Sequence, residues 1–324
     1  MKVFVTGANG LLGVNTILEL LHRGYQVKGL VRDKNKFNFF KHQNLELIEG
    51  NLENEKALND ALQDCNFVIH SAALTQQNLT SYNTYQKVNV EGTKRIINAA
   101  INNKVKRIIY VSTANTIGYG SLENQGMEGN PMKAPFTESF YALSKMEGQK
   151  LVMSKQHQIE VVSVNPTFMI GPYDSKPSSG RIIQMSYGKK IQLYPPGGKN
   201  FVHVADVAKG VVNALENAKN GETYLLAGTN LSYRDFFRQL NSISNQKPLM
   251  VKLPASLMLF IGSFGNLLRK LGFNTDLSIT NMKALCIKNY YSNQKSVSEL
   301  NLKYQPVENA IRDAVSWFKE QKML

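Results

Sequence analysis

Short runs of β-branched and aromatic residues alternate with longer amphipathic stretches along the first two-thirds of the chain. The short runs predict buried strands at 3–5, 26–32, 45–50, 67–70, 107–111 and 161–164. Between them, apolar residues at helical spacing predict helices, including a first helix from Leu11, a second at 55–63 and a long one at 85–102. Strands and helices that alternate in this way, with right-handed crossovers, predict an α/β fold built on a doubly wound parallel sheet.

The first strand runs into a glycine-rich turn, and the first helix follows at once. Such a turn points backbone N–H groups outward at a helix N-terminus, where the aligned peptide dipoles favour an anion. Gly7 suits a sharp exit from the strand, Gly10 leaves room for a pyrophosphate, and Gly13 lets the helix lie close to the sheet. The spacing of three and three differs from the common two-and-three dinucleotide fingerprint, so an ordinary strand–helix turn is the alternative.

The end of the second strand carries Val31 and Arg32, where enzymes that prefer NAD place a carboxylate to hold the ribose hydroxyls. A guanidinium binds a 2′-phosphate and stacks on adenine, so Arg32 favours NADP. The alternative is that Arg32 is a solvated loop residue and that Asp33 turns back toward the ribose, which would favour NAD.

A tyrosine and a lysine in a later predicted helix are candidates for catalysis. Tyr141 and Lys145 are four residues apart and therefore share one helix face. A nearby ammonium favours the tyrosinate, so we expect Lys145 to lower the pKa of Tyr141 toward the working range. Thr113, beside Ser112 at a strand end, offers a hydroxyl for a substrate oxygen on which charge develops. Together these groups suit proton exchange at a carbonyl or alcohol oxygen, coupled to hydride transfer.

The composition indicates a globular chain of 324 residues, 43% of them hydrophobic. The formal charge of +14 arises from dispersed basic residues that do not interleave with aromatics, which predicts a solvated basic surface and no nucleic-acid partner. Two distant cysteines and five histidines without ligand spacing predict no disulfide framework and no metal site. We expect His70, on an apolar strand, to be a hydrogen-bonded core residue. The chain begins directly with a core strand, which predicts a cytoplasmic protein without a signal peptide.

One uncharged apolar stretch covers residues 253–268. It is sixteen residues long and contains a proline, two glycines and an asparagine. Because a spanning helix needs about twenty predominantly apolar residues, we expect no stable membrane insertion. The stretch predicts a helix that covers a substrate pocket, and weak contact with a membrane surface is the alternative.

Seven motifs follow one another in a characteristic order at 6–13, 70–73, 89–93, 110–113, 141–145, 165–172 and 201–208. With them the chain resembles the extended short-chain dehydrogenases/reductases of the epimerase/dehydratase type, and Trp317 in a terminal helix also fits. Val31 with Arg32, together with residues 165–172, 177–180 and 197–203, resembles the NADP-dependent dihydroflavonol reductase-like branch. The resemblance implies a Rossmann-type fold and a homodimer, whose interface commonly contains the helices that carry Asn89 and Tyr141.

The resemblance also implies roles for single positions. Tyr141 would be the general acid/base, Lys145 its modulator and a ribose ligand, and Thr113 the partner of the substrate oxygen. Residues 7–13 would hold the pyrophosphate, 51–52 adenine, 72–73 the nicotinamide ribose and 166–167 the nicotinamide. The whole predicted cofactor-binding set is Gly7, Asn9, Gly10, Leu11, Leu12, Gly13, Arg32, Asn51, Leu52, Ala72, Ala73, Asn89, Tyr141, Lys145, Pro166 and Thr167.

The second half of the chain predicts a smaller, discontinuous C-terminal substrate domain. We expect 1–171 plus 201–228 to form the dinucleotide-binding domain, and 172–200 plus 229–324 to form the substrate domain.

The first hypothesis for the function is an NADP(H)-dependent oxidoreductase that reduces a carbonyl, or oxidises the alcohol, of a small and fairly apolar molecule. A nucleotide-sugar epimerase or dehydratase with tightly bound NAD is the second, with Arg181 or Arg234 as a diphosphate ligand. A non-catalytic dinucleotide-sensing regulator is the third, and the Tyr141–Lys145 pair favours an enzyme over it.

Overall fold

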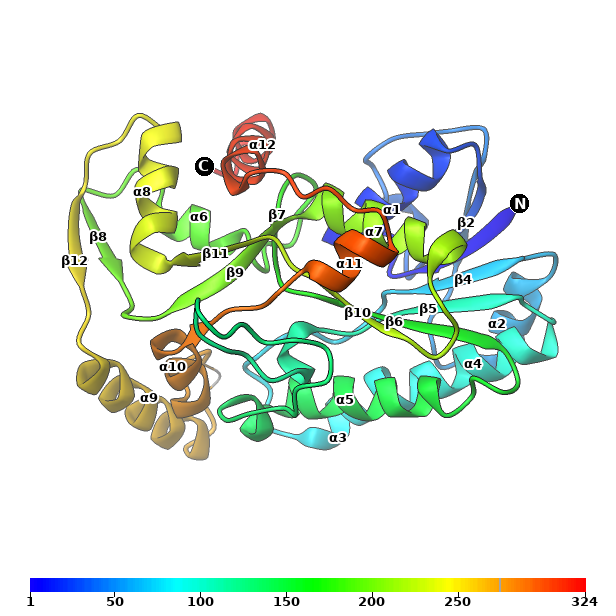
Figure 1. The fold of residues 1–324 in the computed structure, drawn as a ribbon, viewed down its shortest axis with the longest axis horizontal. Helices are drawn as coiled ribbons and strands as arrows, with labels where there is room; N and C mark the ends of the chain where they lie inside the picture. Colours follow the sequence, from blue (N-terminus) through cyan, green and yellow to red (C-terminus); the bar gives the residue numbers. More distant parts are fainter. Residues whose placement is uncertain (274) are drawn as a thin grey trace.

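A seven-stranded parallel sheet forms the centre of the computed structural model, which describes residues 1–273 and 275–324 (Figure 1). The strand order is β10-β6-β5-β4-β1-β2-β3, and every neighbouring pair is parallel. The chain therefore starts in the middle of the sheet, builds outward to β3, and returns to build the other half, which confirms the predicted doubly wound fold. The strands are β1 (Lys2–Thr6), β2 (Gln26–Val31), β3 (Leu45–Glu49), β4 (Phe67–His70), β5 (Arg107–Val111), β6 (Glu160–Pro166) and β10 (Thr223–Leu226).

Helices cover both faces of this sheet, which explains why its strands are apolar on both sides. Side chains alternate along a strand, so Val3 and Val5 of β1 pack on one face and Phe4 packs on the other. The first face is covered by α1 (Leu11–His22) and α7 (Val204–Asn217), and the second by α2 (Glu55–Leu62), α4 (Gly92–Asn102) and α5 (Phe140–Met153).

The long helix predicted at 85–102 begins three residues earlier and changes its winding. α3 (Tyr82–Tyr85) continues through a π-helical segment (Gln86–Glu91) into α4. The neighbouring helix α5 packs closely on this segment, because a Cβ on Gly148 would lie 2.8 Å from the carbonyl oxygen of Asn89. A glycine at this position therefore allows α5 to approach the core.

A second, smaller sheet has the order β11-β9-β13, with β7 paired to β9, and a third consists of β8 and β12. Behind the second sheet lies an aromatic core in which Phe201 stacks on Phe236 with ring centroids 4.3 Å apart. β9 crosses the predicted domain boundary at 200/201, and the division into domains stays a prediction. The elements are β7 (Phe168–Ile170), β8 (Ile191–Tyr194), β9 (Gly198–His203), β11 (Thr229–Ser232), β12 (Leu249–Lys252), β13 (Lys288–Asn289), α6 (Arg181–Ser186), α8 (Tyr233–Ile243), α10 (Ile279–Cys286), α11 (Gln294–Glu299) and α12 (Val307–Glu320).

The apolar stretch at 253–268 forms most of α9 (Ala255–Lys270). Its buried residues are Met258, Gly262 and Gly265, and both glycines face the neighbouring segment 277–282. Within 1–273 and 275–324, no helix is both long enough and apolar enough to cross a membrane. The same residues contain no cluster of three His, Cys, Asp or Glu side chains that could hold a metal ion.

Candidate active site

The glycine-rich turn connects β1 to α1 at the carboxyl edge of the parallel sheet. Gly7 has a φ of +68°, which L side chains rarely adopt, and a Cβ on it would lie 2.8 Å from the backbone nitrogen of Ala72. A Cβ on Gly13 would overlap the carbonyl oxygen of Gly7, so these two glycines shape the turn itself.

Gly10 has a different environment from the other two glycines. It is exposed, and a Cβ on it would meet a single neighbour, the Gly7 carbonyl oxygen, at 3.3 Å. Gly10 is also the N-cap of α1 and has no side chain with which to cap it, so the first N–H groups, beginning at Leu11 and Leu12, are available to an anion. This turn, with Asn9 partly buried in it, fits a dinucleotide pyrophosphate.

Acidic and amide side chains near the ends of β2 and β3 are engaged in local turns. Asp33 accepts a hydrogen bond from the Asn35 nitrogen (3.0 Å) and pairs with Lys36 (2.9 Å). The hydrogen bond to Lys36 is the largest cause that holds the pKa of Asp33 below its ordinary value. Arg32 is exposed. The Asp33 carboxylate, which would contact the ribose under the NAD alternative, is therefore engaged by residues of its own turn.

The adenine-side residues of the predicted set lie at the end of β3. Asn51 accepts a hydrogen bond from the nitrogen of Glu53 (2.8 Å) and remains exposed. Leu52 is buried against Gly92, where an added Cβ would lie 2.9 Å from the Leu52 side chain. The Asn51 side chain is therefore accessible to a cofactor, whereas most of the Leu52 side chain is covered by the protein.

Thr113, Tyr141 and Lys145 come together from β5 and α5. The hydroxyl of Ser139 caps α5 by accepting from the Ala142 nitrogen (3.3 Å), which places Tyr141 in the first turn of the helix. Burial raises the pKa of Tyr141 to about 12, and a hydrogen bond with Thr113 acts in the opposite direction. At neutral pH Tyr141 is therefore a protonated phenol in the neighbourhood of Thr113.

The expectation that Lys145 lowers the pKa of Tyr141 is wrong for this structure. The Lys145 ammonium donates to the carbonyl of Val111 (2.7 Å) and lies 4.2 Å from the ring centroid of Tyr110, so it is directed toward β5. Burial also lowers the pKa of Lys145 to about 7, which reduces its charge. Tyr141 and Lys145 share a helix face, as predicted from their spacing. The direction of the Lys145 ammonium is set by its contacts with Val111 and Tyr110 of β5.

A buried polar network that the sequence did not reveal holds the turn that carries Thr113. The Asn165 amide nitrogen lies 3.0 Å from the Thr113 carbonyl, 2.9 Å from the Thr116 hydroxyl and 3.0 Å from the Gln149 amide oxygen. On its other side, the Asn165 oxygen accepts from Ser163 (2.9 Å). The motif at 165–172 marked Asn165 in the sequence, but only the fold reveals its partners.

Replacing this asparagine tests how much the network contributes. Asn165→Ala should lower the free energy of unfolding by about 2–3 kcal/mol, because each hydrogen bond contributes about 1 kcal/mol and buried groups lose their partners. Urea unfolding measures the change. The exposed Asn217→Ala, at the end of α7, serves as the control and should leave stability within about 0.5 kcal/mol of the original. A stability loss for Asn165→Ala as small as that of the control would contradict a structural role for the network.

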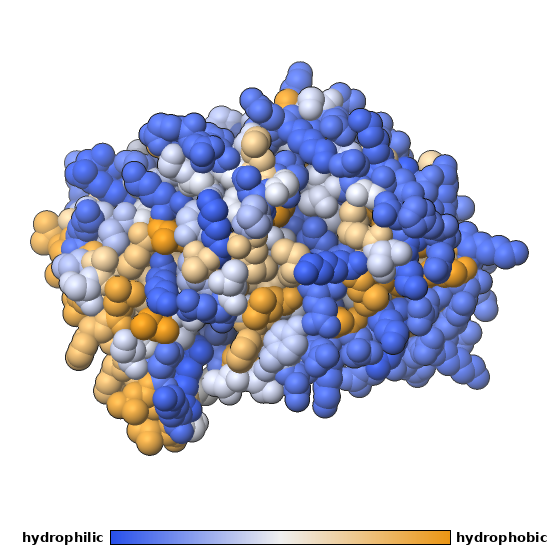
Figure 2. Space-filling view, turned by 60° about the horizontal axis from the view of Figure 1, so that its bottom comes forward, coloured by the Kyte–Doolittle hydropathy of each residue, from blue (hydrophilic) through white to orange (hydrophobic). Residues whose placement is uncertain are grey.

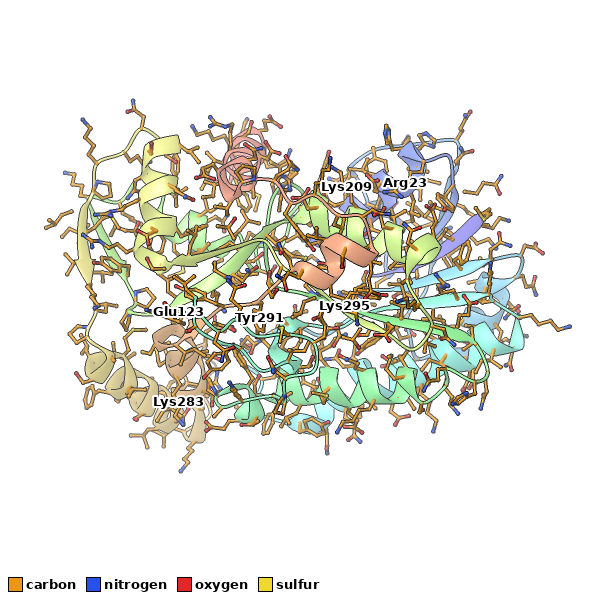
Figure 3. The ribbon with its side chains drawn as sticks, viewed as in Figure 1. Arg23, Glu123, Lys209, Lys283, Tyr291 and Lys295 are labelled. Atoms are coloured by element: carbon orange, nitrogen blue, oxygen red, sulfur yellow. The ribbon has the colours of Figure 1, made fainter. Side chains whose placement is uncertain are left out.

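The C-terminal part of the chain supports the same turn from a second side. Tyr291, which Figure 3 labels near the middle of the molecule, donates to the carbonyls of Ala114 (2.9 Å) and Ile117 (3.2 Å). Buried Tyr291 thus links residues far apart in the sequence next to Thr113.

Asn89, predicted among the cofactor ligands, has its side chain occupied by the protein. Its oxygen accepts from the Leu74 nitrogen (2.7 Å), and its nitrogen donates to the Leu74 carbonyl (3.1 Å) and the Ser144 hydroxyl (2.9 Å). Asn89 therefore holds the loop after β4, which contains Ala72 and Ala73, against α5. These hydrogen bonds give Asn89 a positioning role for this loop, and its contact with the cofactor stays a prediction.

His70 has the environment expected of a core residue. Its ring nitrogens hydrogen-bond with the hydroxyls of Thr6 (2.7 Å) and Thr93 (3.0 Å). Burial lowers the pKa of His70 to about 3, so the ring is neutral at physiological pH.

Strand ends bring the remaining predicted residues to the same edge of the sheet. Pro166 ends β6, and Thr167 donates its hydroxyl hydrogen to the Asn200 amide oxygen (2.7 Å). Because the strands are parallel, the residues after β1, β4, β5 and β6 share one edge. The glycine turn, residues 72–73, Thr113 and residues 166–167 therefore lie along that edge, with Arg32 and Asn51 after the neighbouring strands β2 and β3.

The model of the NAD dependent epimerase/dehydratase family matches residues 3–227. The chain belongs to this family. Over 98% of its length it is 29% identical to a putative dihydroflavonol 4-reductase from Synechocystis, of which 94% is covered. Over 78% of its length it is 29% identical to 4-hydroxy-2-methyl-3-oxo-4-farnesyl-3,4-dihydroquinoline-1-oxide ketoreductase from Stigmatella aurantiaca, of which 76% is covered. The crystal structure of gox2253 is 30% identical and superposes with a TM-score of 0.85, covering 100% of this chain and 99% of the other.

Membership of the epimerase/dehydratase family agrees with the geometry of the site and confirms the resemblance seen in the sequence. The protein is an NAD(P)-dependent oxidoreductase or epimerase of the extended short-chain dehydrogenase/reductase type. The turn at 7–13 fits the pyrophosphate of the dinucleotide that this family uses.

Proposed function

We propose that this protein is an NADP(H)-dependent oxidoreductase that reduces the carbonyl of a small, fairly apolar molecule, or oxidises the corresponding alcohol. The protonated Tyr141 phenol, with Thr113 near it just after β5, is the observation that carries this proposal. A neutral phenol is a proton donor, and a proton donor is what a carbonyl oxygen requires as it becomes an alkoxide.

In the reduction, Tyr141 gives its proton to the substrate oxygen, and Thr113 hydrogen-bonds the same oxygen as negative charge develops on it. The chemistry that a reduced nicotinamide would supply, when bound beside these residues, is a hydride for the carbonyl carbon. Residues 7–13 would hold the pyrophosphate, and residues 72–73 and 166–167 would line the nicotinamide side. Lys145, anchored on the Val111 carbonyl, would reach the nicotinamide ribose and hold α5 in place.

An apolar substrate is supported by the relatives and by the surroundings of the site. The ketoreductase relative is named for a farnesyl-bearing ketone. In this chain, a hollow between the segment before α5 and the α9–α10 pair is lined mostly by apolar side chains: Ala134, Pro135, Leu259, Lys283, Cys286 and Ile287. Apolar walls of this kind favour burial of a hydrocarbon substrate.

The epimerase hypothesis makes a different prediction for the protein as purified. An epimerase would hold a nucleotide sugar and NAD without net redox change. Of the two arginines considered for the diphosphate, Arg181 is paired with Asp276 at 2.7 Å. Native mass spectrometry should find NADP(H) or no ligand; a bound nucleotide sugar together with NAD would replace the reductase assignment by the epimerase one.

The choice of NADP rests on Arg32, whose neighbouring carboxylate is held by Lys36. Arg32→Ala should weaken NADPH binding by about tenfold, which corresponds to about 1.4 kcal/mol, and should change NADH binding little. Fluorescence titration with both dinucleotides measures the effect. Lys34→Ala, two positions away on the same exposed turn, is the matched control. Equal losses of NADPH and NADH affinity, or a wild-type preference for NADH, would contradict the role of Arg32.

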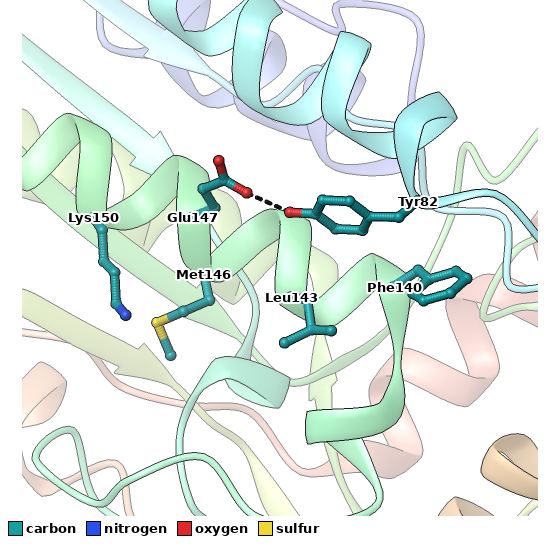
Figure 4. Close-up of a pocket in the computed structure, with 6 residues that line it drawn as sticks. All are labelled: Tyr82, Phe140, Leu143, Met146, Glu147 and Lys150. Atoms are coloured by element: carbon teal, nitrogen blue, oxygen red, sulfur yellow. Dashed lines mark hydrogen bonds between the residues drawn. The ribbon is translucent and has the colours of Figure 1, made fainter.

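We propose that two copies associate through α5, as the resemblance implies. On this helix Phe140, Leu143 and Met146 expose apolar surface around a shallow hollow beside Tyr82, whose hydroxyl hydrogen-bonds Glu147 (Figure 4). Leu143→Glu should therefore convert a dimer into a monomer in sedimentation velocity, because a charge would be buried in the interface. Leu122→Glu, on an exposed loop, should leave the dimer intact. A monomeric wild-type protein, or a dimeric Leu143→Glu variant, would refute this interface.

A further inference from the structure

The α9 helix presents a continuous apolar stripe to solvent. The stripe consists of the exposed side chains of Leu257, Phe260, Phe264 and Leu267, and of Leu271 directly after the last residue of the helix. Their spacing of three and four residues places them along one side of a helix, opposite the buried Met258, Gly262 and Gly265. Phe260 is 70% exposed, so this side has no packing partner within the described residues.

Apolar exposure continues where the chain enters α9. In the two-stranded sheet before it, Ile191 of β8 is paired with Leu249 of β12, and Leu193 with Val251; all four side chains are exposed. Figure 2 shows hydrophobic residues gathered at the left end of the molecule, where Figure 1 places β8, β12 and α9. Large exposed apolar patches of this kind mark interaction sites.

The two segments that form this end of the molecule carry positive charge only. Residues 175–205 and 236–275 contain ten Lys and Arg and no Asp or Glu. Exposed lysines flank the apolar side chains at both strands and at the end of α9: Lys189, Lys190, Lys247, Lys252 and Lys270. Four acidic residues adjoin these segments: Asp174 and Asp206 are buried, Asp235 pairs with Arg238 (3.7 Å), and Asp276 pairs with Arg181 (2.7 Å).

We propose that the α9 stripe docks on the surface of an anionic lipid bilayer, with the neighbouring lysines against the headgroups. An interfacial helix combines an apolar side that enters the acyl boundary with basic residues that contact anionic lipid, which is the combination seen here. A second copy of the chain would be a poorer occupant. A two-fold interface brings the same patch onto itself, so the lysines would face one another without acidic partners.

The helix is attached to the nucleotide-binding part at points close to the candidate active site. Lys283 of α10, labelled in Figure 3, pairs with Glu138 (3.1 Å), three residues before Tyr141. Arg269, at the end of α9, donates to the Gln77 carbonyl (3.2 Å) in the loop after β4. A docked stripe would therefore hold this side of the enzyme at the lipid surface, where apolar molecules accumulate.

Vesicle cosedimentation of the full chain tests the proposal. Wild-type protein should bind vesicles that contain phosphatidylglycerol at least about tenfold better than pure phosphatidylcholine vesicles, and high salt should weaken the binding. Phe264→Glu combined with Leu267→Glu should lower this binding at least about tenfold. The matched control is Leu122→Glu with Met127→Glu: the control side chains are each 51% exposed, against 53% and 52% for Phe264 and Leu267. The control should bind like wild type.

Three outcomes would overturn the proposal. The first is equal vesicle binding by the stripe variant and wild type, and the second is no vesicle binding by wild type. The third is that the wild-type protein is a dimer and the stripe substitutions convert it to a monomer, because the stripe would then bind a second copy of the chain. Unchanged circular dichroism and NADPH affinity would show that the stripe variant is folded.

A fluorescent reporter on the stripe gives an independent measurement. Trp317 is the chain's single tryptophan and is buried, so it provides a constant background. In Phe260→Trp, added anionic vesicles should shift the emission to shorter wavelength, because the indole leaves water. Unchanged emission with bound vesicles would mean that another surface makes the contact.

Discussion

Tyr141→Phe should lower kcat for carbonyl reduction by about 10²- to 10⁴-fold, which is the range that one positioned proton donor contributes. The substitution removes a single oxygen from a side chain whose ring and backbone stay in place. Because the lost group acts on the substrate oxygen, NADPH affinity should change by less than about threefold. Steady-state assays with NADPH and an apolar ketone, together with NADPH titration, separate these two effects.

Tyr25→Phe is the matched control for this experiment. Its hydroxyl hydrogen-bonds Glu216 (2.5 Å), on the α1–α7 side of the sheet, so its loss should leave kcat unchanged. An unchanged kcat in Tyr141→Phe would remove Tyr141 from the role of proton donor. A loss in kcat matched by an equal loss of NADPH affinity would instead indicate that the phenol holds the cofactor.

Substitutions at two glycines of the first turn should have separable effects. Gly13→Ala should lower the free energy of unfolding by about 2–3 kcal/mol, because the added Cβ would overlap the Gly7 carbonyl oxygen, which belongs to rigid backbone. Gly10→Ala adds its Cβ at 3.3 Å from the same oxygen, on the exposed side of the turn. It should change stability by less than about 1 kcal/mol but weaken NADPH binding at least about tenfold, by filling the space expected for the pyrophosphate.

Urea unfolding and NADPH titration of both variants measure these effects. Gly129→Ala is the control, because a Cβ on Gly129 meets nothing within 4 Å, and neither quantity should change. Gly10→Ala with wild-type NADPH affinity would show that the pyrophosphate does not approach this turn. Wild-type stability in Gly13→Ala would show that the turn can shift to accept a methyl group.

The sheet and its ligand edge could be predicted from the sequence because local signals determine them. Short apolar runs separated by amphipathic helices indicate the strands of the sheet, and the motifs then fall at strand ends. The glycine turn between β1 and α1 is local in the same sense. Each depends on residues within a few positions of one another.

Features that depend on packing between distant segments could not be predicted. The spacing of Tyr141 and Lys145 indicated a shared helix face, but the direction of the ammonium depends on Val111 in a separate strand. The partners of Asn165 come from the turn at 113–116, from α5 and from its own strand β6. The sequence likewise predicted a helix at 253–268, and only the fold reveals that its aromatic side faces solvent.

Isotope transfer tests the central claim most directly. The protein is incubated with NADPH deuterated at C4 of the nicotinamide and with a panel of apolar ketones and aldehydes, and the products are analysed by mass spectrometry. We predict an alcohol that carries deuterium on the former carbonyl carbon, formed in step with NADP⁺ and greatly reduced with Tyr141→Phe. Conversion of a nucleotide sugar to its epimer without net consumption of the dinucleotide, and without deuterium in any alcohol, would contradict the assignment as a carbonyl reductase.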